Sequence, residues 1–165
     1  MSKGVLVAGI GNIFLSDDGF GVEVAHRLAA EPMPAGVRVA DYGIRGVHLA
    51  YELLDGYDGL VLVDAVPMGE APGTVAVIMP SLPPGPDGDD DAPVMDAHSM
   101  SPDVVLATLS RLGGSIEHIY VVGCQPASLD EGMGLSVPVA EAVGTAVDLC
   151  RQLVADIGQA QGDEK

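Results

Sequence analysis

Three side chains from separate parts of the chain have the types and positions needed to hold a metal ion. Asp18 lies in the turn after the first apolar run, Asp64 follows the apolar run 61–63, and His98 comes shortly before a helix start. Two carboxylates and one imidazole suit a divalent ion such as nickel, zinc or manganese, and they leave coordination positions open. Water bound to such an ion can be a nucleophile near neutral pH. We therefore take these three residues as candidate metal ligands and candidate catalytic residues.

Simpler explanations exist for two of these residues. Asp64 follows apolar residues of what should be a central strand, where a carboxylate is costly to bury unless it is paired, hydrogen-bonded or bound to a cation. It could merely accept a hydrogen bond from a loop amide at the strand end. His98 could be an ordinary surface group, and no HExxH spacing supports a metal site. The other histidines, His26, His48 and His118, have no comparable placement.

The segments that carry these residues alternate between strand-like and helix-like patterns, which is typical of a parallel sheet covered by helices. Short apolar runs predict the strands, and four-residue apolar spacing and capping residues predict the helices. We expect strands at about 5–8, 37–40, 59–66, 74–79 and 116–123, and helices at about 18–30, 47–54, 101–112 and 136–157.

The order of these elements predicts the fold and the location of the site. The connection before the strand at 74–79 is too short for a crossover helix, so this strand should run antiparallel, beside the preceding strand or at an edge. We predict an α/β fold: a single-domain, open, twisted and mostly parallel five-stranded sheet, with helices on both faces and one antiparallel edge strand. In the common 2-1-3 strand order, a ligand binds at the carboxyl ends of the first and third strands. Asp18 and Asp64 both fall there.

We assign residues 1–158 to this single domain. The segment 80–97 is rich in Pro, Gly and Asp and is expected to be a mobile loop. Residues 159–165 are expected to be a frayed polar tail. Two cysteines without a CxxC spacing predict small buried residues rather than a disulfide or zinc pair.

A Gly-x-Gly turn at 9–11 leaves a nucleotide- or dinucleotide-binding enzyme as the alternative. The dinucleotide fingerprint needs a third glycine at position 14, which is Phe14, and the chain has no Gly-Lys-Ser/Thr motif. Asp41, at the end of the second strand, could be the ribose-binding acid, but the acid pair at 17–18 would repel a pyrophosphate. If no nucleotide binds there, the glycines of this turn allow unusual backbone angles and let a helix pack closely on the sheet.

The charge balance argues against several kinds of partner. With 24 acidic and 7 basic residues, the net charge is -17 at pH 7. Such a chain repels nucleic acid and anionic lipid. No apolar run approaches the roughly 20 residues that span a bilayer, and the first residues lack the features of a signal peptide. We expect a cytoplasmic monomer that binds neither nucleic acid nor a membrane.

The sequence also resembles a known family. "GIGNIFLSDDGFGVEV" resembles the N-terminal signature of the [NiFe]-hydrogenase maturation endopeptidases, G-x-G-N followed by D-[DE]-G-x-G. The resemblance continues through "DYGIRG", "LVLVDAV", a histidine ahead of the third helix, and "VGCQPASLDEGMGLSVPVAEAV". It covers nearly the whole chain apart from residues 80–93 and the tail.

The resemblance implies an endopeptidase that removes a short C-terminal peptide from the nickel-loaded precursor of a [NiFe]-hydrogenase large subunit. In this family the metal-binding residues are the second acid of D-[DE], the aspartate of the third-strand D-A motif and the loop histidine. These correspond to Asp18, Asp64 and His98. The nickel would be carried by the substrate, although other divalent metals could occupy the site in vitro.

Two further expectations concern the reaction. No serine or cysteine has a recognisable base partner in the sequence, so we expect water to be the nucleophile. Asp41, Gly43 and Gly46 form a second loop at the same edge, which could position the substrate tail or be a simple turn. A non-catalytic metallochaperone is a remaining alternative, but four histidines are few for a protein that binds nickel tightly by itself.

Overall fold

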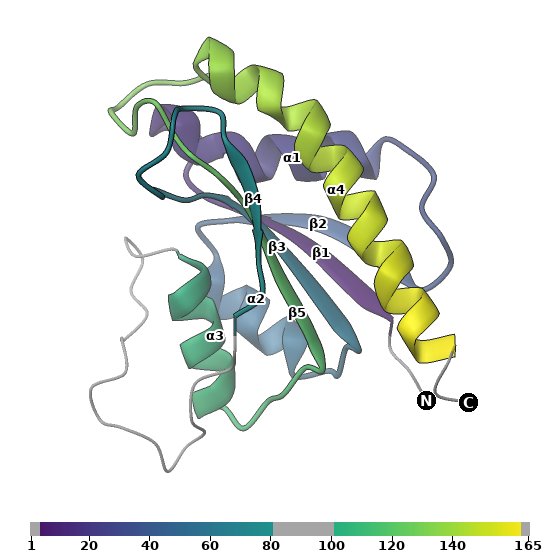
Figure 1. Ribbon diagram of the computed structural model, residues 1–165. Helices are drawn as coiled ribbons and strands as arrows, with labels where there is room; N and C mark the ends of the chain where they lie inside the picture. The colour runs from purple at the N-terminus through teal and green to yellow at the C-terminus, as the bar shows by residue number, and fades with distance from the viewer. Residues whose placement is uncertain (1–3, 81–100, 163–165) are drawn as a thin grey trace.

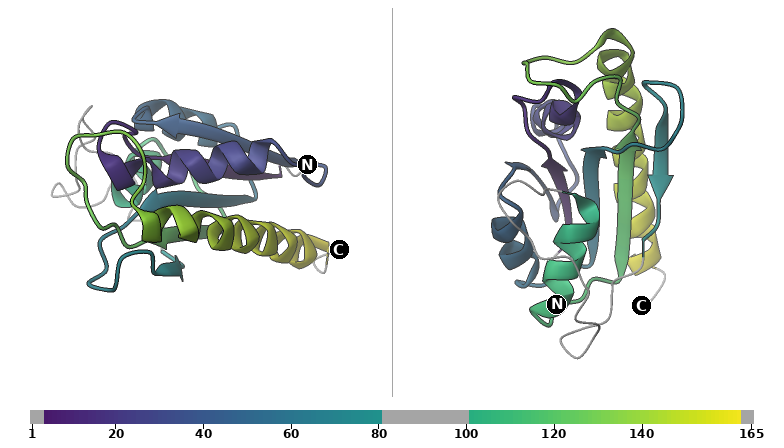
Figure 2. Two further views of the ribbon diagram at one scale, coloured as in Figure 1. Left: turned by 90° about the horizontal axis from the view of Figure 1, so that it is seen from above. Right: turned by 90° about the vertical axis from the view of Figure 1, so that its left-hand side faces the viewer.

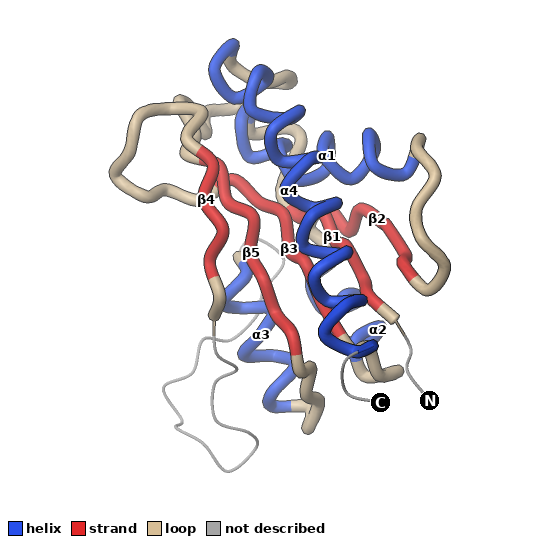
Figure 3. The backbone as a smooth tube through the Cα atoms, turned by 45° about the vertical axis from the view of Figure 1, so that its right-hand side comes forward, coloured by secondary structure: helices blue, strands red, loops and turns tan. Residues whose placement is uncertain are grey.

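A five-stranded sheet with the strand order β2-β1-β3-β5-β4 forms the centre of the molecule (Figure 1). The computed structural model describes residues 4–80 and 101–162. β1, β2, β3 and β5 are parallel, and β4 runs antiparallel to β5. β4 lies at one edge of the sheet (Figure 3). The strands are β1 Val5–Ile10, β2 Val37–Gly43, β3 Gly59–Ala65, β4 Val75–Ile78 and β5 His118–Cys124.

Among the described residues, four α-helices cover the two faces of this sheet (Figures 1 and 2). α1, Phe20–Ala29, and α4, Val137–Gly162, lie side by side on one face. α2, Gly46–Leu53, and α3, Pro102–Arg111, lie on the other face. A one-turn 3-10 helix, η1, Ser16–Gly19, precedes α1. No helix in the described ranges is long and apolar enough to cross a membrane.

The alternation of side chains along the central strands produces two separate cores. In β1, Val5 and Val7 face the core under α1 and α4, whereas Leu6 and Ala8 face the core under α2 and α3. Every residue of β1 and of β3 is buried. A strand that is covered on both faces reads as a continuous apolar run, which is why these two strands could be predicted from sequence.

The predicted fold class is confirmed, as is the 2-1-3 order of the first three strands. The strand expected at 74–79 is at the edge, but its partner is β5 and not the preceding β3, since Val75 pairs with Cys124. Both cysteines are free and buried, as predicted.

Several element bounds differ from expectation, and those at β2, α1 and α4 have a structural reason. β2 continues to Gly43 because β1 continues to Ile10 and pairs with it across an irregularity. α1 begins at Phe20, since η1 occupies the preceding turn. α4 continues through residues 159–162, where glutamine and alanine favour the helix. The rest of the expected tail, 163–165, and residues 81–97 of the expected mobile loop lie outside the described residues.

Two glycines let α1 pack directly against the sheet. A methyl group on Gly21 would lie 2.0 Å from the carbonyl oxygen of Val63 in β3. A methyl group on Gly9 in β1 would lie 2.1 Å from the carbonyl oxygen of Gly21. Gly9 and Gly21 therefore let the first turn of α1 lie close to β1 and β3 near their carboxyl ends, where the candidate site lies.

Candidate active site

Asp18 and Asp64 lie together at the carboxyl ends of β1 and β3. Both residues lie close to Gly11, in the turn that follows β1. A methyl group there would lie 1.9 Å from the backbone oxygen of Asp18 and 3.4 Å from Oδ1 of Asp64. Gly11 has a φ of 134°, a left-handed value that favours glycine. The turn thus requires glycine on both conformational and steric grounds.

A backbone amide in the turn after β1 orients the carboxylate of Asp18. The backbone N–H of Asn12 donates a hydrogen bond of 2.8 Å to Oδ2 of Asp18. The side chain is half-buried, and this burial raises the pKa of Asp18, although the Asn12 hydrogen bond opposes the shift. The carboxylate is therefore oriented on one side and remains partly accessible.

Asp64 is a buried carboxylate that keeps little contact with water. It is 3% exposed, and its Oδ1 accepts a 2.8 Å hydrogen bond from the N–H of Ala65. Burial and then the charge of Asp18 raise the pKa of Asp64 well above its usual range, and the Ala65 amide only partly opposes them. The donor is the next residue of β3 and not a loop amide, and this single bond does not offset the raised pKa of Asp64.

The two carboxylates lack a cationic partner in the part of the chain that the structure describes, where neither forms an ion pair. A bound cation would lower the free energy of a buried, mutually repelling acid pair. The chemistry of this donor pair therefore fits a metal ion. Within residues 4–80 and 101–162, however, there is no group of three or more His, Cys, Asp or Glu side chains that could hold one.

His98, the third candidate, lies outside the described residues. The helix that follows it begins as predicted: the side chain of Ser101 accepts a hydrogen bond from the N–H of Val104, and Pro102 is the first helical residue. Because α3 leads into β5, which is parallel to its neighbour β3, α3 begins at the carboxyl edge of the sheet.

The expected second loop is in fact the end of β2, which holds Asp41 and Gly43, followed by a short turn into α2 at Gly46, and it is bonded to the turn after β1. The N–H of Gly11 donates a 2.9 Å hydrogen bond to the carbonyl of Gly43, whose φ is 54°. Oδ2 of Asp41 lies 2.8 Å from Nε2 of His26 on α1, a contact that the sequence did not indicate. Gly46 is buried at the start of α2. These contacts place this segment beside the Gly11 turn.

Asp17 is the residue that sequence reasoning missed. It is fully buried, and its carboxylate accepts hydrogen bonds from the N–H groups of Ala127, Ser128 and Ser136 and from the Ser136 hydroxyl, at 2.7 to 3.1 Å. Burial alone would raise the pKa of Asp17, but these four bonds outweigh it and the pKa is lowered. Asp17 thereby fastens η1 to the loop after β5. Its partners are at least 110 residues away in sequence, so no local pattern could indicate them.

Gln125 plays a similar part for the loop that follows Asp64. Its Oε1 accepts hydrogen bonds from the N–H groups of Met68 and Glu70, and its own backbone N–H donates to the carbonyl of Thr74. The β3–β4 connection is therefore bonded to the end of β5. The loops around the acid pair are fixed by side chains that are not themselves part of the pair.

The fold and the site together define a doubly wound α/β protein with paired carboxylates, and no phosphate-binding loop, at the carboxyl ends of β1 and β3. Residues 22–152 match the model of the hydrogenase maturation protease family, and the chain belongs to this family. This assignment favours the endopeptidase interpretation over the dinucleotide-binding alternative.

Individual relatives agree with the family assignment. The chain is 34% identical over 158 residues to the hydrogenase expression/formation protein HupD of Bradyrhizobium diazoefficiens, covering 93% of this chain and 79% of that protein. It is 30% identical over 146 residues to the hydrogenase 2 maturation protease of Escherichia coli, covering 84% and 82%.

Solved structures show the same fold. The Escherichia coli hydrogenase maturating endopeptidase HybD matches with a TM-score of 0.71 and 26% identity, over 95% of this chain and 93% of that chain. The hydrogenase 2 maturation peptidase of a Thaumarchaeota archaeon matches with a TM-score of 0.70 and 30% identity, over 93% and 99%. The protein is therefore a hydrolase of the endopeptidase type.

Proposed function

We propose that the protein removes a short C-terminal peptide from the nickel-loaded precursor of a [NiFe]-hydrogenase large subunit, in the cytoplasm. Asp18, Asp64 and His98 contact the nickel that the substrate carries. The observation that carries this proposal is the acid pair of Asp18 and Asp64, which is partly to fully buried and has no cationic partner among the described residues. Nickel in the precursor supplies the missing positive charge.

The acid pair also gives a reason for selectivity. Two carboxylates that repel each other gain binding free energy from a cation, so the enzyme holds a loaded precursor more tightly than an empty one. Gripping the nickel fixes the position of the substrate relative to the enzyme, and with it the scissile bond. His98 completes the donor set from the segment ahead of α3.

Water is the nucleophile in this proposal. The two thiols are poor candidates, because burial raises the pKa of Cys124 to about 11 and that of Cys150 to about 12. The Ser16 hydroxyl donates a hydrogen bond to the backbone oxygen of Asp130 and has no base beside it among the described residues.

The segment that joins the end of β2 to the start of α2, with Asp41, Gly43 and Gly46, positions the substrate tail. It is bonded to the Gly11 turn, which lies beside both acids, so a peptide lying on this segment would be within reach of them. We also expect the free enzyme to be a monomer and to accept divalent ions other than nickel in vitro.

The test is processing of purified precursor, followed by mass spectrometry of the intact protein. The enzyme should shorten the nickel-loaded precursor at its C-terminus and leave the nickel-free precursor intact. Equal cleavage of both forms would contradict the role of nickel, and cleavage of neither would contradict the proposed reaction.

A further inference from the structure

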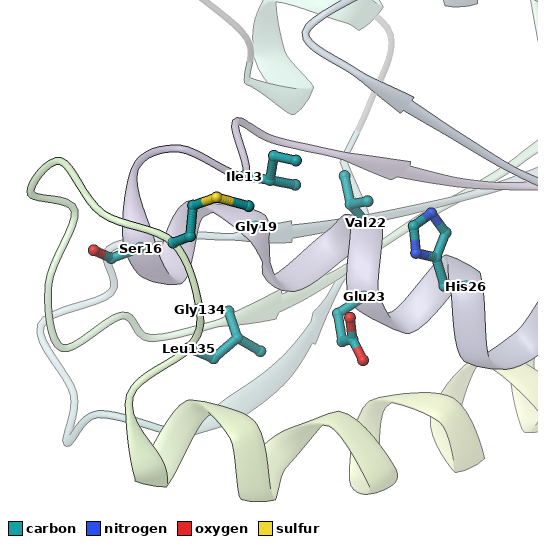
Figure 4. Close-up of a pocket in the computed structure, with 9 residues that line it drawn as sticks. Ile13, Ser16, Gly19, Val22, Glu23, His26, Gly134 and Leu135 are labelled. Atoms are coloured by element: carbon teal, nitrogen blue, oxygen red, sulfur yellow. The ribbon is translucent and has the colours of Figure 1, made fainter.

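A pocket of about 230 Å³ lies on the α1 side of η1, between the loop after β1 and the loop that leads into α4 (Figure 4). Ile13, Val22, Met133 and Leu135 form its apolar lining, and Glu23 and His26 line it from α1. Its walls also include Ser16 and Gly19, which flank Asp17 and Asp18 in η1. Consecutive Cα atoms are 3.8 Å apart, so this pocket lies next to the turn that carries Asp18.

Two large apolar side chains that line this pocket are exposed. Met133 is 72% exposed and Ile13 42%. Exposed apolar side chains that gather around a pocket mark a surface for a partner. Methionine is flexible and polarisable, so Met133 can adapt to the shape of a bound side chain.

The two loops that form the pocket are held together by hydrogen bonds. The N–H of Ser16 donates to the carbonyl of Gly132 at 2.8 Å, and the N–H of Gly132 donates to the carbonyl of Phe14 at 2.9 Å. The carboxylate of Asp17 joins the same two loops from beneath. The pocket is therefore formed before any partner binds, which lowers the entropy cost of binding.

The size of the pocket selects the kind of occupant. Pockets for cofactors and drug-sized molecules are roughly 300–1,000 Å³, which is larger than the 230 Å³ here. A cavity of about 150 Å³ already holds a benzene molecule. The pocket therefore fits one large apolar side chain of a peptide better than it fits a cofactor.

The charges near the pocket favour a basic neighbour for that side chain. Glu23 lines the pocket, and Asp130 and Glu131 are exposed in the adjoining loop. Arg27 lies one helical turn further along α1, and the net charge of the chain is -17. The local balance is thus negative in a strongly negative protein, which attracts a basic segment.

We propose that this pocket binds a large apolar side chain, next to a basic residue, in the large-subunit precursor. It would act as a specificity site beside the scissile region. The identity of the partner rests on the proposed function, whereas the chemistry of the occupant rests on the pocket. Binding in this pocket adds affinity to the contacts with nickel, and it fixes which peptide bond of the precursor lies at the acid pair.

Steady-state processing of nickel-loaded precursor tests the pocket in two ways. Val22→Phe fills it and Glu23→Lys reverses its charge. Each should raise KM at least about tenfold, which is about 1.4 kcal/mol of binding, and leave kcat within about twofold. Val47→Phe on exposed α2 and Asp148→Lys on exposed α4 are the matched controls and should leave KM unchanged. Thermal melting checks that each variant folds. If Val22→Phe does not fold, the KM of Glu23→Lys, a substitution at an exposed position, is the deciding result. Unchanged KM in folded pocket variants overturns the inference.

A second measurement separates this inference from the proposed reaction. The peptide acetyl-Lys-Leu-Lys-amide is added to the free, isotope-labelled protein, and acetyl-Lys-Ala-Lys-amide is the control. The leucine peptide should shift the NMR signals of the Val22 and Leu135 amides, and the alanine peptide should shift them much less. If wild type fails to process precursor, the proposed function fails and the peptide result alone decides about the pocket. Absence of any leucine-dependent shift overturns the inference even if the precursor is processed.

Discussion

Asp17 and Asp18 are neighbours in the chain, but their carboxylates bond to different parts of the molecule. Asp17 is buried and accepts four hydrogen bonds from the loop after β5, whereas Asp18 accepts one from Asn12 and acts electrostatically on Asp64. The first acid has its charge satisfied by the protein, and the second does not. We infer that Asp17 serves the structure and that Asp18 is available for a substrate.

Asp17→Asn should destabilise the protein. The amide would place N–H groups opposite the N–H donors that now bond to the carboxylate, so charge-assisted hydrogen bonds are lost and donors are left unpaired. We expect a loss of about 3 kcal/mol in the free energy of unfolding, measured by urea denaturation. Asp148→Asn, at an exposed position on α4, is the control and should change stability by less than about 0.5 kcal/mol. A similarly small change for Asp17→Asn would refute its structural role.

Asp64→Asn should have the opposite effect on stability in the metal-free protein. Burial and the charge of Asp18 raise the pKa of Asp64 in the folded state, so its ionised form costs stability near neutral pH. We expect the variant to be more stable than wild type at pH 7, by about 1 kcal/mol or more. Urea denaturation in the presence of a chelator is the measurement. A less stable variant would show that the buried charge is compensated.

The stability difference between wild type and Asp64→Asn should also depend on pH, in one direction. A raised folded-state pKa means that the unfolded chain loses its proton first as pH rises. The penalty on wild type is therefore absent below the ordinary pKa of 3.8 and grows as pH rises towards the folded-state pKa of Asp64. The stability difference between Asp64→Asn and wild type should be small near about pH 4 and larger at neutral pH. A difference independent of pH would contradict this assignment.

Gly21→Ala and Gly144→Ala should change stability in opposite directions. A methyl group on Gly21 would collide with carbonyl oxygens of Val63 and Ile10, at 2.0 and 2.5 Å, and backbone cannot yield cheaply. We expect a loss of at least about 3 kcal/mol or a failure to fold. Gly144 in α4 has open space where a methyl group would lie, so alanine should stabilise the helix by about 0.5–1 kcal/mol. Thermal or urea unfolding of both variants is the measurement. A Gly21→Ala variant that is as stable as Gly144→Ala would show that α1 can move away from the sheet.

The fold could be predicted because its main signals are local. β1 and β3 are continuous apolar runs, and the start of α3 has its capping residue and proline in sequence. The partner of β4 could not be predicted, because a short connection predicts direction but does not choose between β3 and β5. The end of α4 was missed because polar residues near the C-terminus are compatible with both a frayed tail and a solvated helix.

The site could be predicted only in part. Asp18 follows β1 and Asp64 lies near the end of β3, and these parallel strands are neighbours in the sheet, so topology alone brings both residues to one edge. The role of Asp17 depends on hydrogen bonds to a loop more than a hundred residues away, and the pocket depends on the pairing of the segments around Leu15 and Gly132. Such long-range contacts leave no periodic pattern in a single sequence.

The assignment of the site is tested most directly by the initial rate at which nickel-loaded precursor is shortened by Asp64→Asn and by His98→Ala. We predict that both variants fold and that each processes precursor at least about a hundredfold more slowly than wild type, because each removes one of the groups that contact nickel. His48→Ala, at an exposed position on α2, and Asp148→Asn should process at the wild-type rate. Full activity in both Asp64→Asn and His98→Ala would contradict the assignment.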